Sequence, residues 1–143
     1  MRSKLLHQDG EATYAVIFET GDEVMAGLTA FAKEHGLDGG HFTAIGAFSS
    51  ATLGFFDIER KEYKKIPIDE QVEVLTLIGD VTLEEGEPKI HAHAVLGLSD
   101  GTTRGGHLVS AYVRPTLELI LIESLAHLRR RFDSEAGLAL IQL

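Results

Sequence analysis

The stretch from Ile90 to Tyr112 constrains the fold more than any other, because it places three histidines on either side of a turn. His91 and His93 are separated by one residue, and alternate residues of a β-strand point to the same face of a sheet. A predicted strand over Lys89–Leu96 therefore carries both imidazoles on one side. The third histidine opens a second predicted strand, His107–Val113.

The link between these strands, Gly97–Gly106, contains a Ser-Asp-Gly-Thr turn sequence. A hairpin centred on Asp100 pairs His107 with His93, and a shift by one pair places it opposite His91. In either register the three rings share a face. An odd register or a bulge would move His107 to the other face. The sequence permits a three-histidine cluster without deciding the register.

Three neutral imidazoles on adjacent strands can occupy three vertices of a tetrahedron and leave the fourth for water or a small ligand, as in catalytic zinc sites. The chain has no cysteine, so a metal site must use His, Asp, Glu or backbone oxygen. We therefore expect a divalent metal, zinc, held by His91, His93 and His107. Nearby carboxylates are Glu87 and Asp100 in sequence, and Asp57, Glu73 and Asp80 through tertiary approach.

Two other interpretations of the histidines stay open. They can be polar residues of an exposed hairpin in a structural domain without a ligand. The spacing also resembles the cupin pattern, but that pattern expects a glutamate three or four residues after the second histidine, where this chain has Leu96 and Gly97. The small residues Ala92 and Ala94 beside the first two histidines favour the metal site.

Length and composition limit the class of protein. The 143 residues suit a single domain over 1–143. The sequence has no apolar run near the roughly 20 residues that cross a bilayer and no signal-peptide pattern at its N-terminus, so we expect a cytoplasmic protein without membrane contact. The formal net charge of −9 argues against nucleic-acid binding. We expect Arg129–Arg131 at a solvated surface or helix end.

A strand is predicted over Tyr14–Glu19 and an amphipathic helix at about 22–35. The helix should be capped by Asp22 or Thr20 and end at Gly36 in the left-handed conformation. Its expected buried positions are spaced by three or four residues: Val24, Leu28, Phe31 and Ala32.

Further strands are predicted at Phe42–Ala47, Ala51–Asp57, Val72–Asp80, Leu117–Ile122 and Leu138–Leu143. The run Leu117–Ile122 is typical of a central strand buried on both faces. Arg114-Pro115 is expected to end the preceding strand, and Leu125–Phe132 to be short helical or irregular. Gly46 indicates a bulge or a close backbone approach.

Two charged residues are candidates for contacting the site. Alternation in Val72–Asp80 puts Glu73 on the same face as two leucines. Its carboxylate can be directed at the histidines or lie at a subunit contact. Alternatively, Glu73 lies near a strand end or pairs with a cation. Arg104 is a candidate cation for a small anionic ligand.

Four stretches in order resemble the PPC (plants and prokaryotes conserved) domain family, over about residues 11–135. They are GDEVMAGLTAFAKEHGL (21–37), HFTAIGAFSSATLGFFD (41–57), VEVLTLIGDV (72–81) and HAHAVLGLSDGTTRGGHL (91–108). The resemblance implies an antiparallel sheet with a flanking helix, a trimer, and a metal site at the three histidines. Glu73–Leu75 resembles part of a segment linked in plant members to transcription-related contacts.

Plant members also carry an AT-hook with an Arg-Gly-Arg-Pro core, of which Arg114-Pro115 is only the last half. Some prokaryotic relatives are nevertheless labelled DNA-binding. We therefore predict an α+β domain, mainly an antiparallel sheet with one long flanking helix and a histidine-bearing hairpin. We expect a trimeric metal-binding protein of unassigned reaction. Metal-assisted hydrolase or lyase chemistry is the first class to test. The alternative is a DNA-associated or regulatory interaction module.

Overall fold

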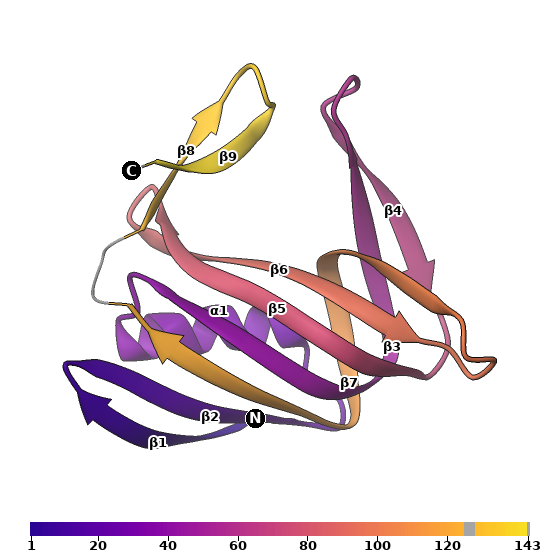
Figure 1. The fold of residues 1–143 in the computed structure, drawn as a ribbon, viewed down its shortest axis with the longest axis horizontal. Coiled ribbons are helices and arrows are strands. Elements are labelled where there is room, and N and C mark those ends of the chain that lie inside the picture. Colours follow the sequence, from indigo (N-terminus) through magenta and orange to yellow (C-terminus); the bar gives the residue numbers. More distant parts are fainter. Residues whose placement is uncertain (125–127, 143) are drawn as a thin grey trace.

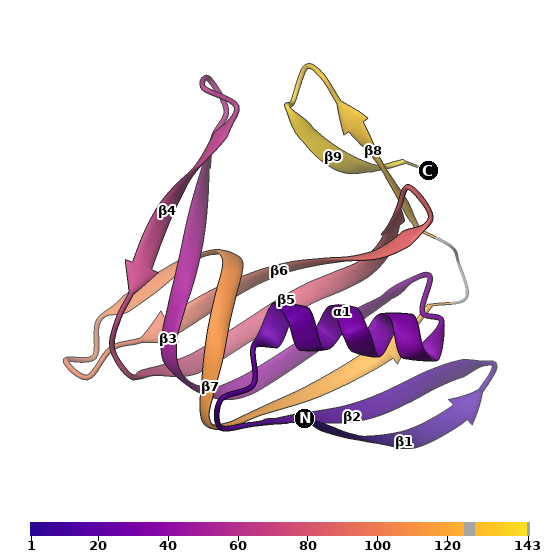
Figure 2. The same cartoon turned by 180° about the vertical axis from the view of Figure 1, so that it is seen from behind.

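The chain forms a twisted, mainly antiparallel sheet with a helix against one face, in a computed structural model that describes residues 1–124 and 128–142 (Figures 1 and 2). Within these residues the single helix is α1 (Val24–His35). The strands are β1 (Arg2–Asp9), β2 (Glu11–Glu19), β3 (Gly40–Asp57), β4 (Glu62–Ile68), β5 (Val72–Glu84), β6 (Glu87–Gly97), β7 (Thr103–Glu123), β8 (Arg129–Asp133) and β9 (Leu138–Gln142). No helix in the described part of the chain is long and apolar enough to cross a membrane.

Strand pairing closes the centre of the sheet into a ring. The main order is β1-β2-β7-β3-β5-β8-β9, while β6 pairs with both β5 and β7, and β4 pairs with β3. Strands β3, β5, β6 and β7 therefore pair in a cycle. β8 continues the sheet beside β5 in a short parallel pairing. The hairpins β3–β4 and β8–β9 rise on the same side of the sheet (Figure 1).

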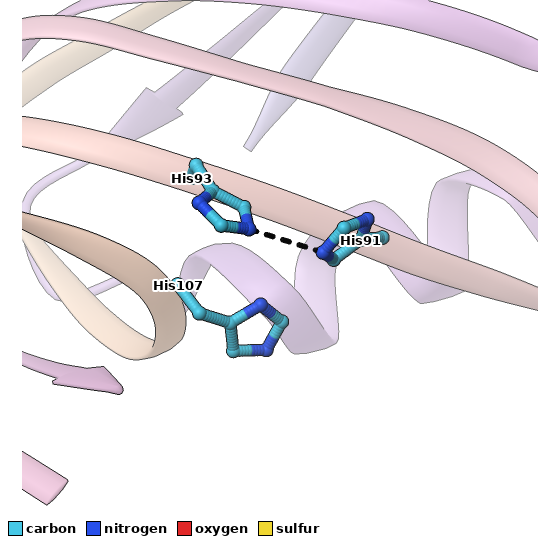
Figure 3. Close-up of side chains that lie close together, drawn as sticks. All are labelled: His91, His93 and His107. Carbon is cyan, nitrogen blue, oxygen red and sulfur yellow. Dashed lines mark hydrogen bonds between the residues drawn. The ribbon is translucent and has the colours of Figure 1, made fainter. Parts of the chain in front are cut away.

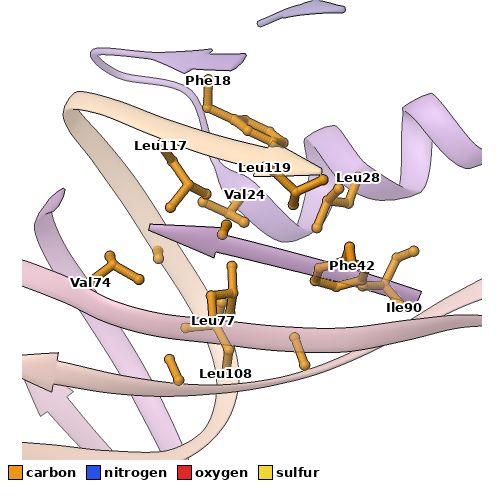
Figure 4. Packing of buried hydrophobic residues seen from close by; sticks show 14 of the residues in the cluster. Phe18, Val24, Leu28, Phe42, Val74, Leu77, Ile90, Leu108, Leu117 and Leu119 are labelled. Carbon is orange, nitrogen blue, oxygen red and sulfur yellow. The ribbon is translucent and has the colours of Figure 1, made fainter. Parts of the chain in front are cut away.

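Apolar side chains fill the space between α1 and the sheet (Figure 4). The helix buries the four predicted positions, from Val24 to Ala32. These belong to one cluster with Phe42 of β3 and with Leu117 and Leu119 of β7. Burial of such side chains contributes roughly 1.5–3 kcal/mol each and fixes which face of every central strand points inward.

The helix is shorter than expected and begins with a different cap. It has 12 residues, so it is not a long helix. Glu23, rather than Asp22 or Thr20, accepts a hydrogen bond from the Ala26 N–H at 2.6 Å. Asp22 accepts instead from the Glu19 N–H at 2.8 Å, which leaves the next carboxylate to satisfy the helix start. Gly36 ends the helix in the left-handed conformation, as predicted.

Strand β3 is continuous where two strands were expected. The small residues coincide with β-bulges and do not break the strand. The pairing with β5 shifts between Ala44 and Gly46, and the pairing with β7 shifts on both sides of Phe48. A Cβ atom on Gly46 would collide with the Thr116 carbonyl. The predicted bulge and close approach at Gly46 are therefore confirmed.

Three other expectations in the second half are corrected. Arg114-Pro115 does not end a strand, because β7 continues through it, and proline is tolerated where the β3 pairing shifts. The run Leu117–Ile122 is central, but Ile120 is exposed in the single chain, so only one face is buried. Of Leu125–Phe132, residues 125–127 lie outside the described part, and the segment from Arg129 is a strand.

Strand β5 changes phase halfway along its length. Its pairing with β6 shifts between Val74 and Thr76. The predicted alternation therefore holds for Val72 and Val74, which are buried, and then inverts: Leu77 is buried and Ile78 is exposed. A bulge adds one residue to one strand, so every later side chain turns to the opposite face.

Candidate metal centre

Three histidines meet on the sheet face opposite the buried Ala92 and Ala94 (Figure 3). His93 pairs directly with His107 across the β6–β7 hairpin, in the register centred on Asp100. His91 follows two residues away from His93 on β6. Each ring offers one nitrogen, and these three nitrogens lie within 4.8 Å of one another.

The donor set suits a metal ion. The Nε2 atoms of His91 and His93 are 3.2 Å apart. Nδ1 of His107 is buried and has no hydrogen-bond partner within the described part of the chain, and such an unpaired group costs about 1–3 kcal/mol. Coordination by its lone pair would remove that penalty. The site therefore has two nitrogens in mutual contact and a third without a partner.

The surroundings of His93 and His107 favour the neutral ring form that binds metal. Burial, followed by the neighbouring His91 and His93, lowers the pKa of His107 to about 4. Burial and then His91 also lower the pKa of His93. Protons therefore do not compete for these two rings at neutral pH.

Asp80 and Arg130 support the back of His91. The Asp80 Oδ2 atom lies 3.5 Å from His91 Nδ1. The Arg130 guanidinium, only 10% exposed, donates to both Asp80 oxygens at 2.9 and 3.1 Å. Burial raises the pKa of the Asp80 carboxyl, but hydrogen bonds from His91 and Arg130 outweigh it, and the net pKa is lowered. Asp80 is therefore held as a carboxylate.

The proton on His91 decides which neighbour its Nδ1 contacts. Arg130 lies 3.2 Å from this nitrogen and can only donate to it. With the proton on Nδ1, the ring instead donates to Asp80 and leaves Nε2 free as a ligand, the carboxylate–histidine arrangement common behind metals. The hydrogen bond from the Nδ1–H group to Asp80 has a charged acceptor and is therefore strong. This protonation state is the one that favours metal binding.

Arg130 is the residue that sequence reasoning missed. We expected Arg129–Arg131 at a solvated surface or helix end, and this expectation is wrong for Arg130. It also donates to Thr82 at 3.0 Å and to the Ala139 carbonyl at 3.0 Å. The signal was present: in a strand, the middle of three consecutive residues faces opposite to its neighbours.

The other two candidate residues lie away from the rings. Arg104 pairs with Leu96 in the hairpin register, whereas the histidines pair further along the hairpin, at His93 and His107. Glu73 is exposed and pairs with Gly97, at the far end of β5 from Asp80. The tertiary structure brings Asp80, rather than Glu73, to the histidines.

The outer sheet face beside this site carries exposed isoleucines among polar residues. A row of register partners crosses it from Ile120 of β7 through Thr43 of β3 and Ile78 of β5 to His93. Ile78 is 53% exposed, and Ile45 on the same face is 61% exposed. This row, with its exposed isoleucines, therefore runs up to the metal centre.

Comparisons with known proteins agree with this architecture. The family model of the Plants and Prokaryotes Conserved (PCC) domain matches residues 7–125. A plant- and prokaryote-conserved protein from Pyrococcus horikoshii is similar in structure, with a TM-score of 0.86 and 34% identity, over 99% of this chain and 95% of that one. A metal-containing protein from Archaeoglobus fulgidus has a TM-score of 0.86 and 32% identity, over 100% and 99%.

A candidate DNA-binding protein from Ralstonia eutropha has a TM-score of 0.85 and 29% identity, over 91% of this chain and 90% of that one. No match was found among the curated proteins.

Proposed function

The chain belongs to the Plants and Prokaryotes Conserved domain family, and we propose that it is a trimeric protein that binds a divalent metal, zinc, through His91, His93 and His107. The observation that carries this proposal is the convergence of three ring nitrogens within 4.8 Å. The buried Nδ1 atom of His107, which has no partner within the described residues, supports it. The similar Archaeoglobus fulgidus protein is described as containing metal, which supports the same assignment.

The donor chemistry favours zinc with one position open. Three imidazole ligands are the protein contribution in catalytic zinc sites, where water or substrate takes the fourth position. A divalent ion bound there would act as a Lewis acid and lower the pKa of its water to about 7. Hydrolase or lyase chemistry is thus the first reaction class to test, and we assign no reaction.

Self-association is proposed through the exposed isoleucines of the outer sheet face. Contiguous exposed apolar residues mark interaction surfaces, and here Ile45, Ile78 and Ile120 occupy one face of β3, β5 and β7. A neighbouring chain packed on this row would approach His93, so assembly and the metal centre would lie next to each other.

Metal analysis tests the proposal. The purified chain is incubated with excess zinc, freed of unbound ion by gel filtration, and measured by elemental analysis. We expect one zinc per chain in the wild type and none in His93→Ala, whereas the control His7→Ala, in exposed β1, retains one. A folded wild-type protein that retains no metal would contradict the proposal.

A second candidate function rests on the similarity to the Ralstonia eutropha protein. A DNA-associated or regulatory module predicts salt-sensitive binding of duplex DNA, against which the net charge of −9 argues. Fluorescence anisotropy with a labelled duplex at low salt distinguishes the two functions. A DNA-binding module should raise the anisotropy of the duplex, whereas a metal-binding protein that does not bind DNA should leave it unchanged.

A further inference from the structure

A cavity of about 340 Å³ lies directly beside the metal centre. His91 of β6 and His107 of β7 line one side of it. The β4 strand contributes Tyr63, and the C-terminal hairpin contributes Phe132 and Leu140. We call this space the hairpin cavity, because its walls are the two hairpins that rise from the sheet in Figures 1 and 2.

The two hairpins touch at their tips. The Lys61 ammonium, at the turn between β3 and β4, donates to the Ser134 carbonyl at 2.6 Å. On the same side, a Cβ atom on Gly137 would lie 2.9 Å from the Lys61 side chain. This contact joins the two hairpins, so the hairpin cavity is bounded by two segments far apart in the sequence.

The walls combine apolar and aromatic side chains with charged ones, and they are partly exposed. The Tyr63 ring lies 4.9 Å from the His107 ring, between their centroids. Phe132, on the opposite hairpin, is 72% exposed. Large apolar side chains that border a cavity in this way are typical of ligand pockets. The volume is at the small end of such pockets, so the ligand should be small.

The cations at the hairpin cavity already have partners. Arg130 is bound to Asp80, and the Lys89 ammonium lies 3.2 Å from the Glu84 carboxylate. These two pairs cancel in charge. Phosphate groups are bound by forked or clustered Arg and Lys donors, which this lining does not leave free. The bound divalent ion would therefore be the main attraction for an anion, and carboxylate oxygen is among the ligands that zinc takes in proteins.

We propose that the hairpin cavity binds a small monocarboxylate with an aromatic or branched apolar body. The carboxylate occupies the open position on the metal held by the three histidines, and the body lies between Tyr63 and Phe132. This inference rests on the proposed metal site and adds the class of its ligand. It gives Tyr63 and Phe132, one from each hairpin, a common role.

Calorimetric titration of the zinc-loaded full chain tests this, with zinc content measured on the same sample. Phenylacetate is the probe, and acetate, 2-phenylethanol and phenyl phosphate are the comparison compounds. We expect phenylacetate to bind at least about ten-fold more tightly than each of them, because only phenylacetate combines a single carboxylate with an aromatic body. Removal of zinc should abolish this difference.

Variants on the walls separate the cavity from the metal. Phe132→Ala should weaken phenylacetate binding by about five-fold or more while zinc content stays at one per chain. Phe132→Leu should restore part of the affinity. The control Phe55→Ala, which removes another exposed phenylalanine outside the hairpin cavity, should leave it unchanged.

The outcomes are distinct. Zinc at one per chain with no preference for phenylacetate overturns the ligand class and leaves the metal site standing. Equal binding of phenylacetate to the zinc-free chain overturns the role of the metal as its receptor. Failure to take up zinc overturns the metal site and this inference together.

Discussion

His93 and His107 face each other across the β6–β7 hairpin, with their ring centroids 5.5 Å apart and their planes at 82°. The neighbouring pair Ala94–Gly106 keeps the same register. The Ser-Asp-Gly-Thr turn therefore fixes the spacing that brings the third ring to the first two. In this arrangement one histidine, His107, has a buried nitrogen without a partner within the described residues, and its removal gives the sharpest prediction.

His107→Leu should stabilise the metal-free protein and abolish its response to zinc. The substitution replaces a buried unpaired nitrogen with an apolar side chain, which should raise the free energy of unfolding by about 1 kcal/mol. Zinc should raise the melting temperature of the wild type only, because a ligand stabilises the state that binds it. Urea unfolding and thermal melts with and without zinc measure both effects. A less stable metal-free variant would contradict the role given to the nitrogen.

The stability of the metal-free wild type should fall in mildly acidic solution. Burial, then the neighbouring histidines, lowers the pKa of His107 from its ordinary value of 6.5 to about 4. Between these values the unfolded chain binds more protons than the folded chain, so the free energy of unfolding decreases as the pH falls through this window. His107→Leu lacks this contribution. Urea unfolding at several pH values should show that the free energy of unfolding of His107→Leu exceeds that of the wild type by more as the pH falls toward 4. If the difference between the two proteins does not change with pH, His107 is not the source of the acid sensitivity.

Asp80→Asn should weaken metal binding without abolishing it. The amide keeps the shape of the side chain but loses the charge that holds the His91 proton on Nδ1, and changes of this kind cost about 10–100-fold in metal affinity. Competition with a coloured zinc chelator measures the affinity. The matched control is Asp69→Asn, in an exposed loop, which should bind zinc like the wild type. Equal affinities for Asp80→Asn and the wild type would show that Asp80 does not orient His91.

Gly46→Ala should destabilise the fold strongly. The backbone at Gly46 has φ +154°, and a Cβ there would overlap the Thr116 carbonyl and the Leu117 backbone. The expected loss is on the order of 3 kcal/mol or more, because backbone of β7 must move. Gly86→Ala is the control: its φ is +85°, but no atom lies within 4 Å of the added carbon, so it should cost only about 1–2 kcal/mol. Chemical denaturation compares the two.

Ile45→Lys should disrupt the proposed trimer. The charge would be placed among the exposed isoleucines of the outer face, where burial against another chain would be unfavourable. Light scattering during gel filtration should give three times the chain mass of 15.6 kDa for the wild type and a smaller mass for the variant. The control Ile58→Lys, at the exposed hairpin turn, should keep the wild-type mass. A monomeric wild type would remove the trimer from the proposal.

Sequence by itself determined the features that depend on local geometry. Period-two alternation put His91 and His93 on one face, and helical spacing identified the buried face of α1. The turn around Asp100 allowed the pairing of His93 with His107 that the structure shows, without selecting it over the neighbouring registers. The sequence also identified the family, through four stretches in order. These features follow from backbone geometry that repeats every few residues, so a short stretch contains all the information that they need.

Only the tertiary structure decided which residues surround the histidines. Asp80 and Arg130 are 50 residues apart and meet because β8 pairs beside β5. The bulge in β5 that turns Leu77 inward is likewise a property of its pairing with β6. Contacts of this kind depend on which strands lie side by side and in which register. A single chain segment does not encode that choice, because many pairings satisfy its local pattern equally well.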